Sequence, residues 1–415
     1  MQYRITVHYA ELALKGKNRQ QFVKRLRQNI RRKLQSMDLE WEVTAIHDRI
    51  FVKAPDTSEA QAEQVVAEIA RIPGIAWLSF VHWFEERIHR FMRPQPDLQP
   101  LHDLVKKLAE KHHRPGLTFA MKVKRSDKNF SQTSQQLAAD LATTVLQETA
   151  WSDVDLSQPD QTFYVNVSSK GTAVYTNKIK GTGGLPVSTT GRVLTLLSGG
   201  FDSPVAAWLM SNRGCNVDFV HFSASHYKQQ DVTAYKISRI AQIISETAGK
   251  VRLFVVPYTH FDMALMAHDM AYDLILFRRF MARVAERIMG QLEAQALVTG
   301  DNLGQVASQT MENINSMNQA VTVPILRPLL TYNKEQIIEM SQQLGLFDVC
   351  REPYKDCCAL ISKNPKTRSD ARELHRLETT HLTDYEDLIN DTLAEVTTVT
   401  YNFGHLVEVT AGEWT

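Results

Sequence analysis

Cysteine is scarce in this sequence. The chain has 415 residues and four cysteines, namely Cys215, Cys350, Cys357 and Cys358. Four cysteines are too few for a domain of this size to be held together by disulfides. No Cys-x-x-Cys pair and no Cys/His cluster with the spacing of a zinc site occurs. This usage favours a reducing, cytosolic compartment and predicts no zinc site.

Long hydrophobic runs are also missing. No apolar stretch approaches the ~20 residues that a membrane-spanning helix needs. Residues 1–9 alternate between polar and apolar, so they lack the apolar core of a secretory signal peptide. These absences exclude the membrane-spanning class. The remaining composition is ordinary for a globular protein, and a length of 415 residues suggests two or three domains.

The net charge of +1 hides an uneven distribution. Residues 1–191 contain 27 Lys and Arg against 20 Asp and Glu, a net of +7, and residues 192–415 contain 20 against 26, a net of −6. Residues 1–35 alone hold ten basic side chains and one acidic side chain, Glu11. A basic front half indicates a polyanionic partner. The simpler alternative is a solvated, charged helix face.

One stretch organises the rest of the chain. Val193–Leu197 has the pattern of a buried strand, Ser198–Ser203 (Ser-Gly-Gly-Phe-Asp-Ser) that of a tight turn, and the residues from Pro204 that of a helix. A glycine-rich turn between a strand and a helix N-terminus is a typical anion-binding arrangement. The Gly-Lys-Ser/Thr of a Walker A loop is absent. The turn is similar to the SGGxDS pyrophosphate loop of ATP pyrophosphatases; the alternative is a turn without a ligand.

The front half is predicted to contain two α+β arrangements. Strands at 3–9, 40–46, 50–54 and 75–84 and helices at 18–34 and 57–71 follow the order of a ferredoxin-like domain. A linker at 91–96 leads to a second arrangement, with a helix from residue 97, a strand at 117–125, a helix at 131–149 and strands at 163–167 and 173–179. A basic cluster surrounds Phe130 and contains Lys122, Lys124, Arg125 and Lys128.

The rear half alternates strands and helices. Strands are expected at 193–197, 217–222, 251–256, 296–299 and 321–324, and helices at 205–212, 232–248, 274–289 and 334–344. This rhythm predicts a doubly wound parallel sheet with its ligand beyond the carboxyl ends of the strands. Residues 369–415 are polar and partly helical, and they end without another series of alternating strands and helices.

With these features read together, the chain resembles the tRNA 4-thiouridine synthetases, tRNA sulfurtransferases that also supply sulfur for thiamine synthesis. The motifs that carry the resemblance are Tyr9–Arg19, Arg71–Ile75, Phe119–Arg125 with Lys128 and Phe130, Gly181–Val187, Arg278–Arg283, Thr299–Thr310 and Leu326–Leu329. Two departures are Ser188, where glycine is usual, and Asp301-Asn302, where an acidic-small pair is usual. The implied domains are a ferredoxin-like domain (1–75), a THUMP RNA-binding domain (76–180) and a PP-loop ATP pyrophosphatase domain (181–415).

The resemblance implies an ATP site. Its residues are Leu196, Leu197, Ser198, Gly199, Gly200, Ser203, His221, Phe222, Arg278, Gly300 and Gln309. Asp202 would hold Mg²⁺ or orient loop N–H groups, and Lys334 would neutralise charge on the leaving phosphate. Without the family, the two leucines read as core, His221 as a hydrogen-bonded strand-end histidine and Lys334 as an exposed helix lysine.

The resemblance also places the sulfur chemistry on a cysteine. Cys358 would carry a persulfide, with Cys357 as the alternative donor and Cys350 or Cys357 as the resolving thiol; Cys215 fits a buried structural thiol. The target uridine (position 8 of tRNA) would be adenylated at O4 and then attacked at C4 by sulfur. Because no cysteine follows Cys358, we expect the form without a rhodanese domain, loaded directly by a cysteine desulfurase.

The expected partners follow from the same family. The front half would hold the acceptor arm of tRNA by its shape and phosphates, with the target base turned out of its stack. A homodimer and a sulfur carrier protein for thiamine synthesis are further implied partners. Two alternatives stay open: another PP-loop tRNA-modifying ATP pyrophosphatase, which the THUMP-like half disfavours, and a non-catalytic tRNA-binding protein.

Overall fold

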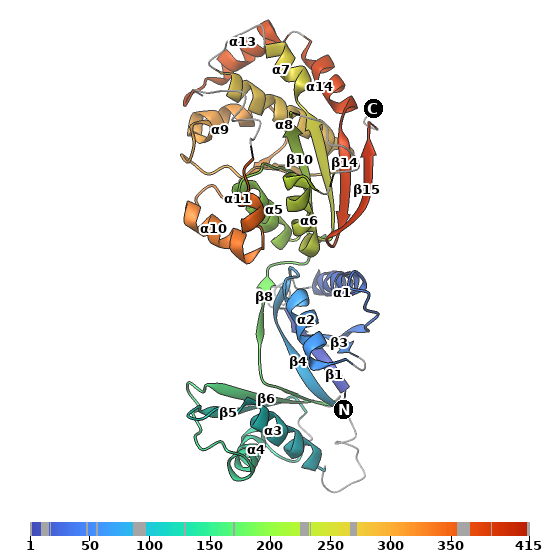
Figure 1. The fold of residues 1–415 in the computed structure, drawn as a ribbon, viewed down its shortest axis with the longest axis vertical. Helices are drawn as coiled ribbons and strands as arrows, with labels where there is room; N and C mark the ends of the chain where they lie inside the picture. Colours follow the sequence, from blue (N-terminus) through green and yellow to red (C-terminus); the bar gives the residue numbers. More distant parts are fainter. Residues whose placement is uncertain are drawn as a thin grey trace. The chain divides into compact units, whose positions relative to one another are not determined.

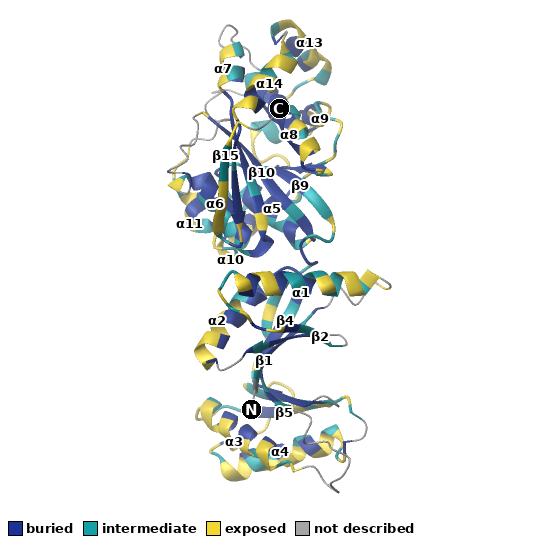
Figure 2. Cartoon of the chain, turned by 90° about the vertical axis from the view of Figure 1, so that its right-hand side faces the viewer, coloured by how far each residue is buried: buried dark blue, intermediate teal, exposed yellow. Residues whose placement is uncertain are grey.

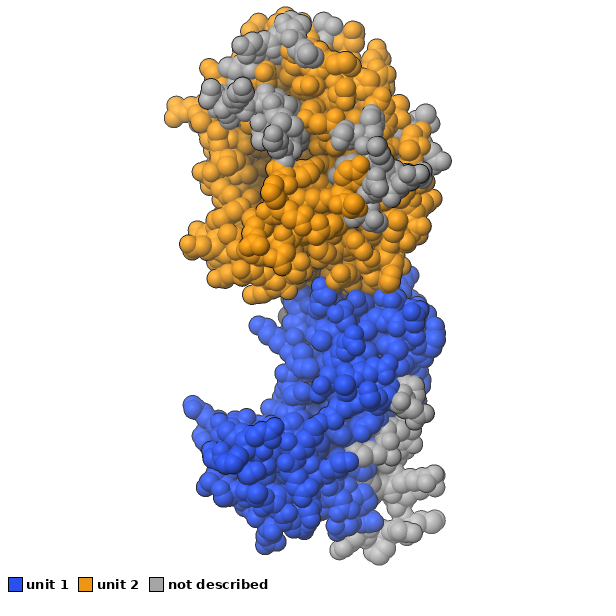
Figure 3. Space-filling model, viewed as in Figure 1, with its two compact units in different colours: residues 1–183 blue, residues 184–415 orange. Residues whose placement is uncertain are grey.

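The chain folds into two units, residues 1–183 and residues 184–415 (Figure 3). The computed structural model describes residues 2–9, 16, 18–46, 49–54, 57–85, 97–127, 130–168, 171–224, 232, 234–265, 272–354, 366–382 and 384–412. Among these residues, no helix has both the length and the apolar character needed to cross a bilayer.

The first unit begins with the predicted ferredoxin-like order. It consists of β1 (Gln2–His8), α1 (Arg19–Gln35), β2 (Val43–Ile46), β3 (Arg49–Ala54), α2 (Glu59–Ala70) and β4 (Ile75–Glu85). β1 pairs antiparallel with both β3 and β4. Helix α1 forms because Leu26, Ile30 and Leu34 recur every four residues and bury one face, while its basic side chains occupy the others.

The same sheet continues into the second half of this unit. That half contains α3 (Gln99–His112), β5 (Phe119–Arg125), α4 (Ser134–Glu148), β6 (Gln161–Ser168), β7 (Gly171–Tyr175) and β8 (Ile179–Gly183). The strand order is β2-β3-β1-β4-β7-β6-β5, with β8 also paired to β4. β4 serves both halves because its eleven residues are long enough to pair with β1, β7 and β8. The boundary predicted after residue 75 falls at the first residue of this shared strand.

The second unit is a seven-stranded sheet between two helical layers (Figure 1). Its strands are β9 (Gly191–Leu196), β10 (Cys215–Ser223), β11 (Lys250–Pro257), β12 (Ala296–Val298), β13 (Ile325–Leu326), β14 (Thr397–Asn402) and β15 (His405–Ala411). The order is β13-β12-β9-β10-β11-β14-β15. The first five are parallel, which confirms the predicted doubly wound fold.

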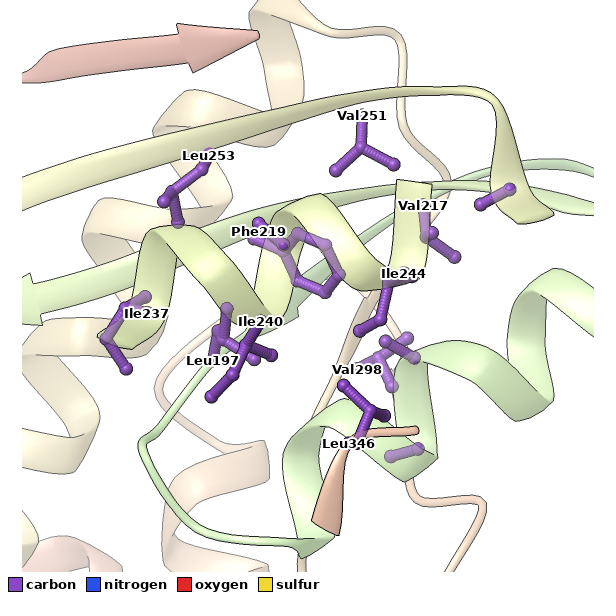
Figure 4. Close-up of a cluster of buried hydrophobic side chains, with 14 of the residues drawn as sticks. Leu197, Val217, Phe219, Ile237, Ile240, Ile244, Val251, Leu253, Val298 and Leu346 are labelled. Carbon is purple, nitrogen blue, oxygen red and sulfur yellow. The ribbon is translucent and has the colours of Figure 1, made fainter. Parts of the chain in front are cut away.

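Helices cover both faces of this sheet. They are α5 (Asp202–Asn212), α6 (Lys236–Ala248), α7 (Thr259–Leu265), α8 (Asp273–Gln291), α9 (Met311–Asn318), α10 (Lys334–Gln343), α11 (Phe347–Arg351), α13 (Ala371–His381) and α14 (Tyr385–Ala394). Along β10, Val217 and Phe219 face the core formed with α5, α6, α10 and α11 (Figure 4). Val220 and Phe222 face α7, α8, α13 and α14. Figure 2 shows β10 buried and the outer helix faces exposed.

Two features of this sheet differ from the prediction. The strand predicted at 321–324 is wrong: β13 is Ile325–Leu326, and Pro324, which lacks an N–H, contributes only its carbonyl, an acceptor for the N–H of Leu297 (3.0 Å). The tail forms the antiparallel hairpin β14–β15, which is not among the predicted strands. Its turn has positive φ at Phe403 (47°) and Gly404 (86°), as a two-residue hairpin turn requires.

Ser188 adopts a backbone conformation that favours glycine. Its φ is 71°, in the left-handed region, where a non-glycine residue costs of order 1 kcal/mol or more. Its hydroxyl hydrogen-bonds Oδ1 of Asn216 (2.6 Å), a contact that glycine cannot make. Ser188 therefore holds a conformation that suits glycine and makes a side-chain hydrogen bond there.

A buried ion pair holds α13 against α8. Arg279 donates to both oxygens of Glu378 (2.7 and 3.0 Å), and Arg283 donates to Oε2 (2.9 Å). Burial by itself raises the pKa of Glu378, but the two arginines outweigh it and lower the pKa below its ordinary value. The pair's contribution to stability is therefore present above about pH 4.3 and is lost as the pH falls through the lowered pKa.

We expect Glu378→Gln to lower the free energy of unfolding of the second unit by about 3–5 kcal/mol, because it leaves buried arginines without a carboxylate. Glu386→Gln is the matched control: its pair with Arg287 is exposed, so its cost should stay below about 1 kcal/mol. Urea denaturation of the full chain measures both. Equal losses in the two variants would contradict the buried pair.

Candidate functional site

The predicted phosphate loop lies between the end of β9 and the start of α5. The backbone N–H of Ser198 donates to Oγ of Ser203 (2.8 Å), and the two hydroxyls lie 3.0 Å apart. The N–H of Gly200 reaches Oγ of Ser198 (3.4 Å). Leu197 is buried in the core, and Leu196 is partly buried. The two serines thus close the turn at the N-terminus of α5, where phosphate binding is favourable.

His221 links this loop to Tyr354. Its Nδ1 lies 2.8 Å from the carbonyl oxygen of Leu197, which can only accept, so Nδ1 carries the proton. Nε2 then accepts from the hydroxyl of Tyr354 (2.7 Å). Both nitrogens are therefore hydrogen-bonded, as expected of a strand-end histidine with structural partners. Phe222 packs edge-to-face with Phe277 and Phe280 in the core.

Tyr354 is a residue of the candidate site that the sequence did not reveal. Its ring lies over the loop so closely that a Cβ on Gly199 would be 2.5 Å from Cδ1 of the ring. Lys236 lies over the same ring (5.5 Å) and donates to the carbonyls of Cys350 (2.9 Å) and Glu352 (2.7 Å). A lone tyrosine in a polar segment gives no sequence signal, because its partners lie far away in the chain.

The structure brings Asp202 and Lys334 together. Nζ of Lys334 lies 2.7 and 2.9 Å from the two carboxylate oxygens of Asp202, although the residues are 132 positions apart. The two residues begin α5 and α10, and both side chains are partly exposed. The described residues hold no group of three or more His, Cys, Asp or Glu side chains arranged for a metal. An Mg²⁺ ion here would need Asp202 together with oxygens of a bound phosphate, which is a usual Mg²⁺ environment.

Three further predicted residues gather beyond β12. A Cβ on Gly300 would lie 2.5 Å from the backbone nitrogen of Ser203, so this glycine touches the start of α5. Nη1 of Arg278 donates to the carbonyl of Ser308 (3.0 Å). Oε1 of Gln309 is buried and has no hydrogen-bond partner among the described residues. A buried acceptor without a donor fits an amino or hydroxyl group of a nucleotide.

Asp301 is a second residue that the sequence undervalued. Its Oδ1 accepts from Nη2 of Arg278 (2.6 Å), and its Oδ2 accepts from the hydroxyl of Thr299 (2.8 Å). Burial raises the pKa of Asp301, but its arginine neighbours and Thr299 more than compensate and lower it. An acid directly after a buried strand is the available signal, and the departure of Asp301-Asn302 from the family's usual pair obscures it.

The structure describes two of the four cysteines, Cys215 and Cys350. Cys357 and Cys358 lie outside the described residues, as does Lys128 of the basic cluster. Cys350 is buried in α11, and burial raises the pKa of its thiol to about 11. Burial also raises the pKa of Cys215, which lies in the core as expected of a structural thiol. Because the thiolate is the reactive form, Cys350 is poorly suited to act as a resolving thiol.

The basic front half contains a pocket of about 460 Å³. Its described lining comes from α1, the residue after β1, and β2, and consists of Tyr9, Arg19, Gln20, Val23, Lys24, Arg27 and Ala45. The hydroxyl of Tyr9 accepts from Arg19 (3.3 Å). Nε of Arg27 is buried and has no partner among the described residues. Three cations and no carboxylate in this described lining make the pocket suitable for an anion.

Fold and loop together define a class of protein: an α/β nucleotide-binding domain of the ATP pyrophosphatase type that follows a ferredoxin-like domain and a THUMP domain. Three family models match accordingly. "Thiamine biosynthesis protein (ThiI)" matches residues 188–382, "ThiI ferredoxin-like domain" matches residues 4–79 and "THUMP domain" matches residues 96–177.

Curated relatives give the family. A "Probable tRNA sulfurtransferase" of Macrococcus caseolyticus is 35% identical over 96% of each chain. One of Brevibacillus brevis is 34% identical over 94% of each chain. The chain belongs to the tRNA sulfurtransferase family, as its sequence motifs predicted.

Solved structures agree with this family assignment. A 4-thiouridine synthetase in complex with RNA and with bound ATP has a TM-score of 0.85 and 28% identity, covering 97% of this chain and all of that one. PH1313 from Pyrococcus horikoshii has a TM-score of 0.62 at 22% identity, covering 83% of this chain and all of its own. The second likeness concerns the fold alone.

We expect Cys350 to resist alkylation in the folded protein. At about pH 8, iodoacetamide should leave Cys215 and Cys350 unmodified over a time in which both react fully after unfolding, because burial keeps them protonated and inaccessible. Peptide mass spectrometry reads each cysteine separately. Rapid native modification of Cys350 would restore it as a candidate resolving thiol.

Proposed function

We propose that this protein converts uridine at position 8 of tRNA to 4-thiouridine, using ATP to activate O4 and a persulfide on Cys358 as the sulfur source. The observation that carries the proposal is the contact between Asp202 and Lys334 (2.7 Å) beside the glycine–serine loop. The similar 4-thiouridine synthetase has both RNA and ATP bound, which supports the same two ligands for this chain.

The ion pair suits the departure of pyrophosphate. Phosphates on the loop would bring negative charge next to Lys334, which can then neutralise the charge that develops on the leaving group. Asp202 would share an Mg²⁺ ion with phosphate oxygens. O4 of the uridine attacks the α-phosphorus, the bond to pyrophosphate breaks, and the uridine keeps AMP on O4.

The second half of the reaction transfers sulfur. The terminal sulfur of the Cys358 persulfide attacks C4, and AMP leaves with O4. The S–S bond that remains between the base and Cys358 is then broken by a second thiol, which forms a disulfide with Cys358 and releases 4-thiouridine. Cys350 is poorly suited to this resolving role because it is buried and its pKa is raised to about 11; Cys357 is the other candidate in this chain.

We call the stretch between Tyr354 and Thr367, which contains Cys357 and Cys358, the cysteine segment. The residues at its two ends support its place in this reaction. Before it, Tyr354 contacts Gly199 and His221, and four residues of chain span at most about 14 Å between Tyr354 and Cys358. After it, the carbonyl of Thr367 accepts from the hydroxyl of Thr310 (2.7 Å), next to Gln309. A thiol on this segment is therefore within reach of the loop.

The front half would bind the acceptor arm of tRNA through its phosphates, with the pocket around Arg27 as one contact. A cysteine desulfurase as donor, a homodimer, sulfur transfer to a thiamine carrier protein and a cytoplasmic location are further parts of the proposal that come from the family resemblance.

The central test incubates unmodified tRNA with the protein, ATP, Mg²⁺ and a cysteine desulfurase with cysteine, and measures 4-thiouridine by nucleoside mass spectrometry. We expect Cys358→Ala to reduce thiolation to background while ATP binding persists, because the nucleophile alone is lost. Cys350→Ala, which removes a buried thiol, is the matched control and should retain most activity. Normal thiolation by Cys358→Ala would refute the assignment.

ATP binding without tRNA-dependent pyrophosphate release in the unaltered protein would indicate a non-catalytic tRNA-binding protein.

The pocket gives a separate prediction for RNA binding. Arg27→Gln should weaken tRNA binding for any sequence and reduce the slope of log affinity against log salt by about 1, because one phosphate contact is lost. Lys53→Gln is the control, since Lys53 already pairs with Glu42 (2.8 Å) in the same unit. Filter binding over a range of salt concentrations measures both slopes. An unchanged slope for Arg27→Gln would remove the pocket from the RNA surface.

A further inference from the structure

A buried network joins the carboxyl ends of β12 and β13. Asp301, just after β12, accepts from Nη2 of Arg278 (2.6 Å) through Oδ1 and from Nε of Arg327 (3.2 Å) through Oδ2. Arg327 follows β13 directly. The side chains of Arg278, Asp301 and Arg327 are 11%, 5% and 8% exposed. One carboxylate is thus shared by two buried guanidinium groups, and the three side chains together carry a charge of +1.

Arg327 has an unused donor in this network. Its Nε is taken by Asp301, and its Nη1 lies 3.3 Å from the carbonyl of Ile325. Its Nη2 is buried and has no hydrogen-bond partner among the described residues. Burial lowers the pKa of this guanidinium, which reflects the cost of holding its charge away from water. An anion at Nη2 would satisfy this donor and offset part of the buried positive charge.

The network borders the proposed nucleotide site. Gly300, directly before Asp301, lies against the backbone of Ser203 at the start of α5. β13, β12 and β9 are consecutive parallel neighbours, so the residues after each of them line one edge of the sheet. Ligands of doubly wound sheets bind along that edge.

A similar trio elsewhere in the same sheet serves as a comparison. Asp218 is 1% exposed and pairs with Arg192 and Arg252 near the amino-terminal ends of β9 and β11. These two arginines are 30% and 26% exposed, so water can solvate their surplus charge. Neither has a buried, unpartnered nitrogen. The two trios share their charges and differ in solvation and in which end of the sheet they occupy.

We propose that Arg327 is the donor of a second phosphate-binding site beside the glycine–serine loop, in which Nη2 binds a phosphate oxygen while Asp301 holds the guanidinium in place. The phosphate belongs either to the nucleotide or to the RNA backbone next to the target uridine. The inference rests on the proposed function, since it takes both substrates to meet at this edge of the sheet.

The test uses the full chain with Arg327→Gln, Arg327→Lys and the control Arg252→Gln. Calorimetry measures ATP binding, and filter binding measures unmodified tRNA. Loss of a charge-assisted hydrogen bond should weaken one ligand about tenfold or more in Arg327→Gln. Arg327→Lys, which keeps the charge without the planar fork, should fall between this variant and the unaltered protein. Arg252→Gln should bind both ligands normally.

The ligand that weakens identifies the phosphate: ATP for a nucleotide phosphate, tRNA for a backbone phosphate. The inference is overturned if Arg327→Gln, or Arg327→Lys where the first variant does not fold, binds both ligands as tightly as Arg252→Gln does. Failure of the unaltered protein to bind ATP would instead overturn the proposed function, so the two failures are distinguishable.

Discussion

The site of the second unit depends on two approaches of the chain that only glycine permits. A Cβ would lie 2.5 Å from the ring of Tyr354 at Gly199 and 2.5 Å from the backbone of Ser203 at Gly300. Neither glycine has a positive φ, so space rather than backbone conformation requires glycine at these positions. The first contact attaches the residue before the cysteine segment to the loop. The second contact, at Gly300, brings the end of β12 against the start of α5. Asp301, which pairs with Arg278 and Arg327, follows directly.

Two neighbouring arginines of α8, Arg278 and Arg279, form ion pairs with different carboxylates. Arg279 pairs with Glu378 (2.7 Å) and so holds α13 against α8, whereas Arg278 pairs with Asp301 (2.6 Å) at the strand ends. Adjacent residues on a helix point about 100° apart, so one helical turn supplies both a structural ion pair and a residue of the candidate site. Each buried carboxylate has more than one cationic partner, which is why each keeps a lowered pKa at a buried position.

The fold was largely readable from the sequence, and the contacts within the site were not. Hydrophobic periodicity located β9, the loop and α5 because strand, turn and helix are local patterns. The same approach missed β14, although its Thr-Thr-Val-Thr-Tyr run is rich in β-formers, and it placed β13 too early because Val321 and Val323 mimic a strand. Pairing of Asp202 with Lys334 spans 132 residues, and no local pattern carries such a distance. The burial of Cys350 likewise depends on how α11 packs against α6.

The flanks of the cysteine segment explain how one reactive sulfur could serve a reaction that begins on a phosphate loop. Tyr354 and Thr367 are both hydrogen-bonded to elements of the candidate site, to His221 (2.7 Å) and Thr310 (2.7 Å). Folding therefore already holds the two ends of the segment beside the candidate site. If Cys358 carries the persulfide, as proposed, the sulfur reaches activated C4 as an intramolecular neighbour of the loop, independently of any free sulfide.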